Sequence, residues 1–456
     1  MKKLILIFSI FIYIECASQN YGHLGGNYQL NHQTFEKYGE TNEKRVPYSS
    51  GYLNLIYQYK NITIGNRLEL YKNPIDGFTE YEGYGLGNYF IQFKNNFFDI
   101  TAGTFYEEFG SGLIFKTYFD SSLGIDNSVN GLRIKSTPTK GVYITTLIGK
   151  QRSQWKESTF SWSSNQYSEG LLRAVNADIS INEIIFKEWQ SRIHAGFSFV
   201  TKKENDSDPI YVLPNNVGAL NGRLSITKNN VSVNIDYAHK INDPSSDNNY
   251  IYQNGHGLIL TSNYSQKGFG VSLGLKRIQN MSFRSERNAV FQDLHINYIS
   301  PFTKQQAYAL ATIYPYASQP NGEMGSQIDI YYTVPKKTKL GGKYGTSINI
   351  NFANVFNINQ KKANNAEYLN ERGTLGYNSD FLRLGPDKLF QELNIEIIKK
   401  FSRNLKIITT YIHLQNNDKI LTSQDILPGE TYDFIKAHII IFESIIKTPK
   451  YMTVPI

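Results

Sequence analysis

The feature that most limits the fold of this chain is a regular alternation of apolar and polar residues. Val231–Tyr237, Phe269–Leu275 and Ser347–Phe352 alternate without a break, and Ile62–Leu70 does so with one break, at Asn66. A period of two is that of a β-strand whose two faces meet different surroundings. Weaker copies lie at 53–59, 89–93, 132–135, 193–199, 224–226 and 294–298. We therefore expect an all-β protein.

The connections between these segments alternate as well. Short turns fall at 60–61, 95–96, 138–139, 182–188, 229–230, 265–267, 300–303, 335–338, 401–403 and 447–450. Long polar stretches fall between them, at 34–48, 72–82, 107–129, 153–169, 202–215, 241–253, 280–289, 316–324, 353–386 and 416–431. This order is typical of an up-and-down antiparallel sheet with tight periplasmic turns and long extracellular loops. It predicts about twenty strands.

A membrane barrel explains the alternation better than a soluble β-sandwich, which would turn its apolar face inward. Segments of about 10–11 residues suit a tilted strand that crosses a bilayer, whereas soluble strands are nearer 5–6. The polar positions include mid-strand charges such as Arg67 and Asp236, which a dry core would exclude, so the apolar face must be the outer one. Aromatic residues make up 14% of the chain and gather near strand ends, where barrels carry aromatic girdles. We predict an up-and-down antiparallel transmembrane β-barrel.

The composition excludes several other classes. A hydrophobic content of 40% and a mean hydropathy of −0.39 do not fit a helical membrane bundle, which needs runs of about 20 apolar residues. The many aromatic residues argue against disorder. A single cysteine, Cys16, excludes a disulfide scaffold and a cysteine-rich metal site. The net charge of +8 comes from dispersed residues without a nucleic-acid motif, so no nucleic-acid partner is expected.

The first residues have the pattern of a secretory signal peptide. Lys2 and Lys3 precede an apolar run from Leu4 to Ile14, and we place cleavage after Ser18. The alternative is a lipoprotein signal in which Cys16 carries the lipid. Residues 1–18 are thus expected to be the signal peptide, and residues 19–456 the barrel of the cell outer membrane of a Gram-negative bacterium.

The last residues do not fit a closing strand. After the turn at 447–450 another strand begins at Tyr451, and the sequence stops at Val454-Pro455-Ile456. Proline removes a donor from the strand ladder. We expect either a truncated sequence or an atypical closing strand.

One segment carries a family resemblance. Phe105–Lys116, which contains Gly110-Ser111-Gly112, and Ser122–Gly131, which contains Asp126-Asn127, look like the signature of an uncharacterised outer-membrane barrel family typical of Bacteroidota. That family is a domain of unknown function. The resemblance implies a large barrel over the whole mature chain and brings no catalytic residues with it.

Charged side chains at the polar strand positions are the candidate lining of the lumen. They are Arg67, Glu69, Asp99, Arg133, Lys135, Asp178, Arg192, His194, Asp236 and Lys276. The stretch 107–129 is a candidate inward-folding loop, with Glu107, Gly110, Gly112, Asp126 and Asn127 as its marked residues, because glycine allows backbone conformations that other residues resist. The stretch 353–386 is long enough to fold inward as well.

No motif predicts chemistry. The histidines at 23, 32, 194, 239, 256, 295, 413 and 438 form no close pair of the His-x-x-x-His type. Gly83–Gly87 precedes no helix, so it is not a dinucleotide loop, and alternating glycines there fit small lumenal positions or a strand bend. We expect no enzyme activity, no cofactor and no metal.

Two functions fit these expectations. The first is a porin-like passive channel for small solutes, because a barrel of this width leaves an aqueous lumen unless something fills it. The second is a non-conducting barrel subunit of an envelope assembly or secretion complex. The expected partners are outer-membrane lipid and, for the second function, other envelope proteins. Inward loops that close the lumen would discriminate between the two.

Overall fold

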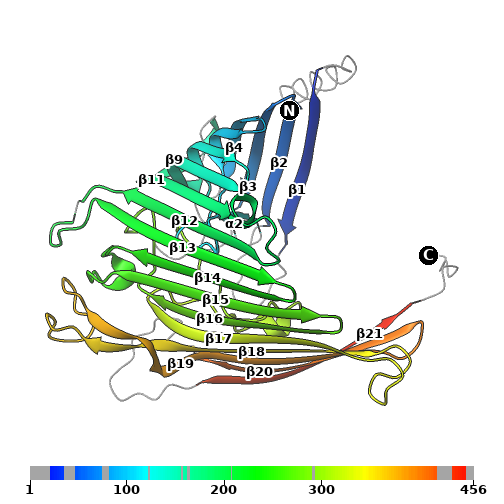
Figure 1. The fold of residues 1–456 in the computed structure, drawn as a ribbon. Helices are drawn as coiled ribbons and strands as arrows, with labels where there is room; N and C mark the ends of the chain where they lie inside the picture. The colour runs from blue at the N-terminus through cyan, green and yellow to red at the C-terminus, as the bar shows by residue number, and fades with distance from the viewer. Residues whose placement is uncertain are drawn as a thin grey trace.

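The computed structural model describes residues 21–34, 47–73, 82–121, 124–155, 158–161, 165–206, 208–289, 293–417 and 434–447 (Figure 1). In the first half the strands are β1 (His23–Gln33), β2 (Tyr48–Tyr59), β3 (Ile62–Lys72), β4 (Gly83–Lys94), β5 (Phe98–Phe105), β6 (Phe119–Asp120), β7 (Ile125–Asp126), β8 (Val129–Thr139), β9 (Val142–Trp155), β10 (Ser158–Ser161) and β11 (Asn165–Ser180). The second half contains β12 (Arg192–Lys203), β13 (Asn216–Lys228), β14 (Val231–Lys240), β15 (Gly255–Gln266), β16 (Phe269–Gln279), β17 (Gly322–Val334), β18 (Thr346–Lys362), β19 (Tyr377–Lys400), β20 (Leu405–Asn416) and β21 (Ile435–Ile446). Within these described ranges, helical turns are confined to α2 (Ile181–Ile184), η1 (Ser246–Asn248) and η2 (Ala309–Thr312).

The long strands form one sheet of 19 strands in which each pairs antiparallel with the next along the chain. Only the short β10 departs from this order within the described residues, because it pairs parallel with β4. The sheet curls round on itself, and its end strands β1 and β21 are not paired with each other in the part of the chain that is described (Figure 1). The predicted all-β, up-and-down antiparallel architecture is confirmed.

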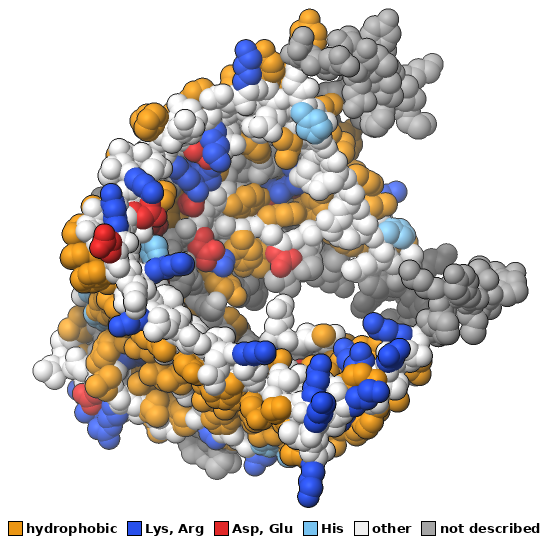
Figure 2. All heavy atoms as spheres, turned by 45° about the vertical axis from the view of Figure 1, so that its right-hand side comes forward, with side chains coloured by type: hydrophobic (Ala, Val, Ile, Leu, Met, Phe, Trp, Pro, Cys, Tyr) orange, Lys and Arg blue, Asp and Glu red, His pale blue; other side chains and the backbone are white. Residues whose placement is uncertain are grey.

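The outer face of the curled sheet is apolar, as a lipid-facing wall requires. In the β13–β14 pair, Leu224 lies opposite Ile235 and both side chains are exposed on the outer face. Their neighbours Arg223 and Asp236 are also opposite each other, on the inner face. In Figure 2 the wall curls around a hollow, and orange hydrophobic side chains cover its outside. The wall is that of an outer-membrane β-barrel.

The predicted turn at 300–303 implies one strand on each side of it, between the long stretches 280–289 and 316–324. This prediction is wrong. Residues 280–321 form one long connection between β16 and β17, here called the β16–β17 loop, and 294–298 is not a strand within it. The alternation at 294–298 has another origin: the segment runs beside a second loop, with Ile296 buried and the Asn297 amide bonded to backbone oxygens. Strand-like alternation therefore arose from packing inside the barrel.

The predicted long loop at 353–386 is also wrong. β18 continues to Lys362 and β19 begins at Tyr377, so the true connection is 363–376. This connection packs against the β14–β15 connection at the end of the sheet that carries the long loops, where the Tyr252 amide donates to the Thr374 carbonyl at 2.8 Å.

A hydrophobic core fills part of the interior. Two loops supply one side of it: the β5–β8 loop, residues 106–128, gives Phe109, Leu113, Ile114 and Phe115, and the β16–β17 loop gives Met281, Phe283 and Ile296. Inward side chains of the wall complete this core: Phe105, Val129, Leu147, Leu172, Ala174, Val200, Val217, Ala219, Ala238 and Ile278. A second cluster packs Phe302 and Tyr316 of the β16–β17 loop on the wall of β18 to β20.

No helix among the described residues is long and apolar enough to span a membrane. The expected signal peptide, with Cys16, and the expected turn and strand start beyond Lys447 lie outside the described residues.

Candidate functional site

The two inward loops are joined to each other in the lumen. The Lys116 amide donates to the Ile296 carbonyl at 2.8 Å, and the Tyr298 amide donates to the Gly112 carbonyl at 2.9 Å. The Asn127 side chain belongs to the same junction, since its amide donates to the His295 carbonyl at 3.3 Å. The loops therefore form one body rather than two independent flaps.

A buried charge quartet ties the β5–β8 loop to the wall. Arg152 of β9 lies 2.8 Å from a Glu69 oxygen and 2.7 Å from an Asp126 oxygen. Arg67 of β3 contacts the same carboxylates, at 2.7 Å from Glu69 and in a short contact with Asp126. Two guanidinium groups thus neutralise two carboxylates, and all four side chains are at most 6% exposed. The arrangement satisfies the charges only while the loop stays in place, because Asp126 belongs to the loop.

The sheet bends to make room for this quartet. β4 slips in register against β3 between Arg67 and Leu68, and Gly87 lies at the slip. A Cβ atom on Gly87 would overlap the Glu69 carboxylate. The glycine is therefore required by the close approach, in agreement with the small lumenal position or strand bend expected there.

A second set of ion pairs fixes the start of the same loop. The Glu107 carboxylate lies 3.3 Å from Arg133 and 2.7 Å from Lys135, both of β8. Arg133 also lies 3.7 Å from Asp99 of β5. Asp99, Arg133 and Lys135 stand on the neighbouring strands β5 and β8, so they hold Glu107 and the first residues of the loop against the wall.

The tip of the β5–β8 loop rests on Asp236 of β14. The Ser111 amide and hydroxyl donate to the same Asp236 oxygen at 3.1 and 2.7 Å. Gly110 adopts a φ of +58°, and a Cβ atom there would overlap the Arg223 side chain. Arg223 in turn lies 2.8 Å from Asp178. The loop tip therefore closes over a polar row on β11 to β14.

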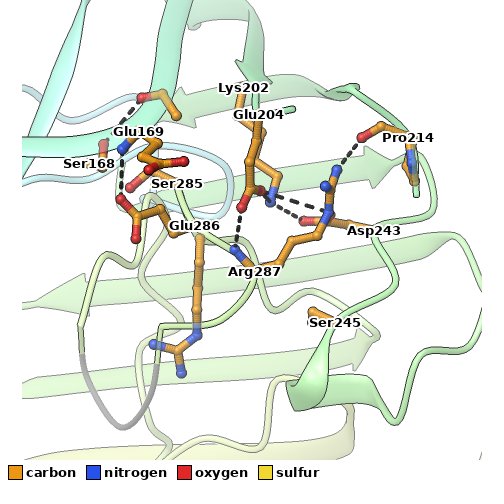
Figure 3. Close-up of polar contacts among 12 residues, drawn as sticks. Ser168, Glu169, Lys202, Glu204, Pro214, Asp243, Ser245, Ser285, Glu286 and Arg287 are labelled. Atoms are coloured by element: carbon orange, nitrogen blue, oxygen red, sulfur yellow. Dashed lines mark hydrogen bonds and ion pairs between the residues drawn. The ribbon is translucent and has the colours of Figure 1, made fainter. Parts of the chain in front are cut away.

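A charge cluster at the end of the barrel with the long loops anchors the β16–β17 loop (Figure 3). Arg287 of the loop lies 3.3 Å from Asp243 and 3.7 Å from Glu204, while Lys202 of β12 lies 2.8 Å from Asp243. Burial acts to raise the pKa of Asp243, but the ammonium groups of Lys202 and Lys240 outweigh it, so the pKa lies below the ordinary 3.8. Asp243 is thus a carboxylate at neutral pH and binds the loop as an anion.

An ion pair on the inner wall binds the C-terminal part of the β16–β17 loop. Lys276 of β16 and Glu323 of β17 form a fully buried ion pair at 2.5 Å. Lys276 also donates to the Ser300 carbonyl at 2.6 Å and the Ser318 hydroxyl at 3.0 Å, both in the β16–β17 loop. The predicted lumenal Lys276 therefore acts as an anchor.

Two cavities lie along the inner wall beside the loops, toward the end of the sheet that carries the short turns. One, of about 370 Å³, extends from the loop tip along β11 to β15 and is lined by Asp178, His194, Arg223, Ser225, Asn234 and Thr261 among others. The other, of about 460 Å³, lies along β15 to β19 and is lined by Ser272, Lys304, Asp329, Asn349, Asn351 and Glu396 among others. Both linings combine acidic, basic and amide groups with apolar side chains such as Ile259 and Ile330.

The structure places the lumenal candidates from the sequence on the inner face, but in two groups. The members in buried or partly buried contacts with the loops or the wall are Arg67, Glu69, Asp99, Arg133, Asp236 and Lys276. The members that keep more exposure are Lys135, Asp178, Arg192 and His194. Of all these candidates, Asp178, His194 and Asp236 line the cavity at the loop tip.

Sequence reasoning missed two inward arginines. Strict alternation in β9 turns Gln151 inward and Arg152 outward, but the β9–β11 register is irregular there and both point inward. Arg223 lies one residue before the weak alternating segment 224–226 and is not among the lumenal candidates from the sequence. Arg223 keeps the inward alternation with Ser225, which is a signal that sequence reasoning could have used.

Four of the histidines are brought together in pairs that the sequence does not reveal. His239 lies opposite His256 across β14 and β15, and His413 lies opposite His438 across β20 and β21. Both pairs are on the outer face, near the strand ends that lead into the long loops. No group of three or more His, Cys, Asp or Glu side chains is placed to hold a metal ion in the described part of the chain.

Comparison with known proteins gives a family and distant structural likenesses. The model described as "Family of unknown function (DUF6029)" matches residues 1–455. No curated protein matches the sequence. Pseudomonas aeruginosa OccK5 (OpdH) is 11% identical, with a TM-score of 0.40 over 93% of this chain and 97% of that one. Pseudomonas aeruginosa OccD3 (OpdP) is 13% identical, with a TM-score of 0.42 over 93% and 90% of the two chains. The chain belongs to the DUF6029 family.

Proposed function

We propose that this DUF6029 member is a passive outer-membrane channel for small polar solutes. The observation that carries the proposal is the space left beside the loops. The two inward loops fill part of the lumen, and Lys304 of the β16–β17 loop reaches the periplasmic half, but cavities of about 370 and 460 Å³ remain on the wall there. A lining of mixed charges and amides offers hydrogen bonds at many positions without a single strong trap, as conduction requires.

The size of the solute follows from the loops. Ion pairs hold the β5–β8 loop at Glu107 and Asp126 and the β16–β17 loop at Arg287. A passage beside such a body is narrow, so the proposal is limited to ions and small molecules. The alternative, a non-conducting barrel of an envelope complex, requires that the loops and their apolar core seal the lumen completely.

Planar-bilayer conductance of the folded, heat-modifiable protein tests the proposal. Steady openings with a conductance proportional to salt concentration are expected. Replacement of residues 284–318 by a short Gly-Ser linker removes much of the inward body, so it is expected to raise the conductance several-fold. A silent parent together with a conducting linker variant would contradict the open channel and favour the sealed barrel.

Charge reversal tests the wall. Arg192→Glu and Lys304→Glu place acidic groups in the periplasmic half, so each is expected to move the reversal potential in a salt gradient toward cation preference. Lys361→Glu is the matched control, because Lys361 pairs with Asp380 on the exposed extracellular hairpin. Equal shifts of the reversal potential in all three variants would mean that the charges of the inner wall do not determine ion preference.

A further inference from the structure

The outer wall carries the same unusual arrangement twice. On β14, Tyr237 and His239 stand two residues apart, and His256 of β15 lies opposite His239. On β20, Tyr411 and His413 stand two residues apart, and His438 of β21 lies opposite His413. Each arrangement therefore consists of a tyrosine, a histidine two residues after it on the same strand, and a second histidine that faces the first from the next strand.

The contacts within the two arrangements also agree. Tyr237 Oη lies 3.0 Å from His256 Nδ1, and Tyr411 Oη lies 2.9 Å from His438 Nδ1. The facing imidazole rings are 4.8 Å apart in the first pair and 4.5 Å apart in the second. The repeat of distances on separate strands indicates one kind of site built twice.

Each arrangement stands beside a basic residue on the same outer face. Arg277 of β16 lies opposite Leu258, two positions from His256 in the ladder, which is within reach of a long side chain. Lys436 of β21 lies two positions before His438 and is exposed. These neighbours make both places unfavourable for a cation and favourable for an anion.

Several hydrogen-bond donors in these places lack an acceptor. Arg277 is 3% exposed, and its Nε and Nη1 atoms have no hydrogen-bond partner among the described residues. His413 Nδ1 is likewise buried without a partner there. Its Nε2 faces the Gln415 amide at 3.1 Å, which leaves Nδ1 as the donor. Buried donors without acceptors are costly, so a group rich in oxygen acceptors would stabilise both places.

The position in the membrane identifies the source of such a group. β14 and β20 run from short periplasmic turns to long extracellular loops, so His239 and His413 lie at the level of the outer-leaflet headgroups. Exposed apolar side chains follow directly toward the membrane centre, as Ile235 does on β14 and Ile440 and Phe442 do on β21. Acyl chains pack on that surface. We propose that each arrangement binds the phosphate of an outer-leaflet lipid through its paired imidazoles and tyrosine. The buried Arg277 adds positive charge beside the first site, and the exposed Lys436 contacts the phosphate in the second.

Native mass spectrometry of the full chain, refolded in detergent, tests the proposal with phosphatidic acid as the probe. Two retained lipids per chain are expected, and diacylglycerol, which lacks the phosphate, should be retained at least about fivefold less. The double variant His256→Gln with Arg277→Gln should lose one lipid, and His438→Gln with Lys436→Gln should lose the other. Heat-modifiable mobility of every variant shows that the barrel has folded.

A tyrosine and a lysine at the opposite end of the strands provide the control for loss of a basic residue. Lys60 lies over the Tyr59 ring at 5.1 Å at the periplasmic end of β2. Lys60→Gln should leave both retained lipids in place. Retention that is unchanged in both double variants would overturn the proposal. Full displacement by inorganic phosphate at millimolar concentration would also overturn it, since it would show a site for free phosphate rather than for a lipid.

Discussion

The buried charge quartet gives a quantitative prediction. Arg152→Met removes a guanidinium group that is 1% exposed and contacts two carboxylates. Arg67 then faces both Glu69 and Asp126, so one negative charge stays buried without compensation. Removal of one partner from a buried ion pair costs about 3–5 kcal/mol in proteins. We expect the free energy of unfolding to fall by that amount.

A second variant separates lost charge balance from lost packing. Glu69→Gln added to Arg152→Met leaves Arg67 opposite Asp126 alone, which restores neutrality. The double variant should therefore recover about 1–3 kcal/mol relative to Arg152→Met, the range of coupling between contacting residues. Lys361→Met serves as the surface control, since both partners of its ion pair are more than half exposed, and it should be indistinguishable from the parent.

Denaturant titration in lipid vesicles, followed by tryptophan fluorescence, measures these differences. Loss of heat-modifiable mobility provides an independent readout. The reasoning is refuted if Arg152→Met lies within about 1 kcal/mol of the parent, or if the double variant is no more stable than Arg152→Met.

Three further predictions concern the loops. Gly110→Val forces a β-branched residue into a positive φ against Arg223, so it should cost about 1–3 kcal/mol, whereas Gly222→Ala, with open space at its Cβ, should be neutral in the same titration. Because the pKa of Asp243 lies below 3.8, the loop anchor should hold from pH 7 to about pH 4 and be lost only as the pH falls through that lower pKa; a conductance change near pH 6 would contradict it. Arg287→Gln removes the cation of that anchor, so single-channel recordings should show larger or noisier openings at neutral pH, and recordings identical to the parent would contradict it.

Sequence alone predicted the wall well because lipid imposes the alternation. Val231–Tyr237 and Phe269–Leu275 fall within β14 and β16, and the tight turn at 229–230 joins β13 to β14. Where strands leave the lipid, the pattern disappears. Residues 353–362 of β18 and 377–386 of β19 read as a loop because outside the membrane both faces of a strand can carry polar groups.

The interior was harder to predict because loops, rather than strands, determine it. Each lumenal charge could be assigned to a face by counting, as for Lys276 and Asp236. Its partners could not be assigned, because they come from residues far away in the chain: Asp236 bonds to Ser111, and Lys276 to Ser318. The apparent strand at 294–298 shows the same difficulty, since contact with another loop imitated contact with a membrane.

The length of β19 has a consequence for what meets this protein from outside the cell. Its 24 residues correspond to roughly 80 Å of extended chain, whereas a tilted strand crosses the bilayer with about 9–11. Together with the 17 residues of β18, it forms a ladder-bonded arm that continues well past the headgroups. The β18–β19 hairpin therefore offers an antibody or a bacteriophage a ladder-bonded surface outside the bilayer, so it is a described part of the barrel on which immune pressure and phage adsorption would act.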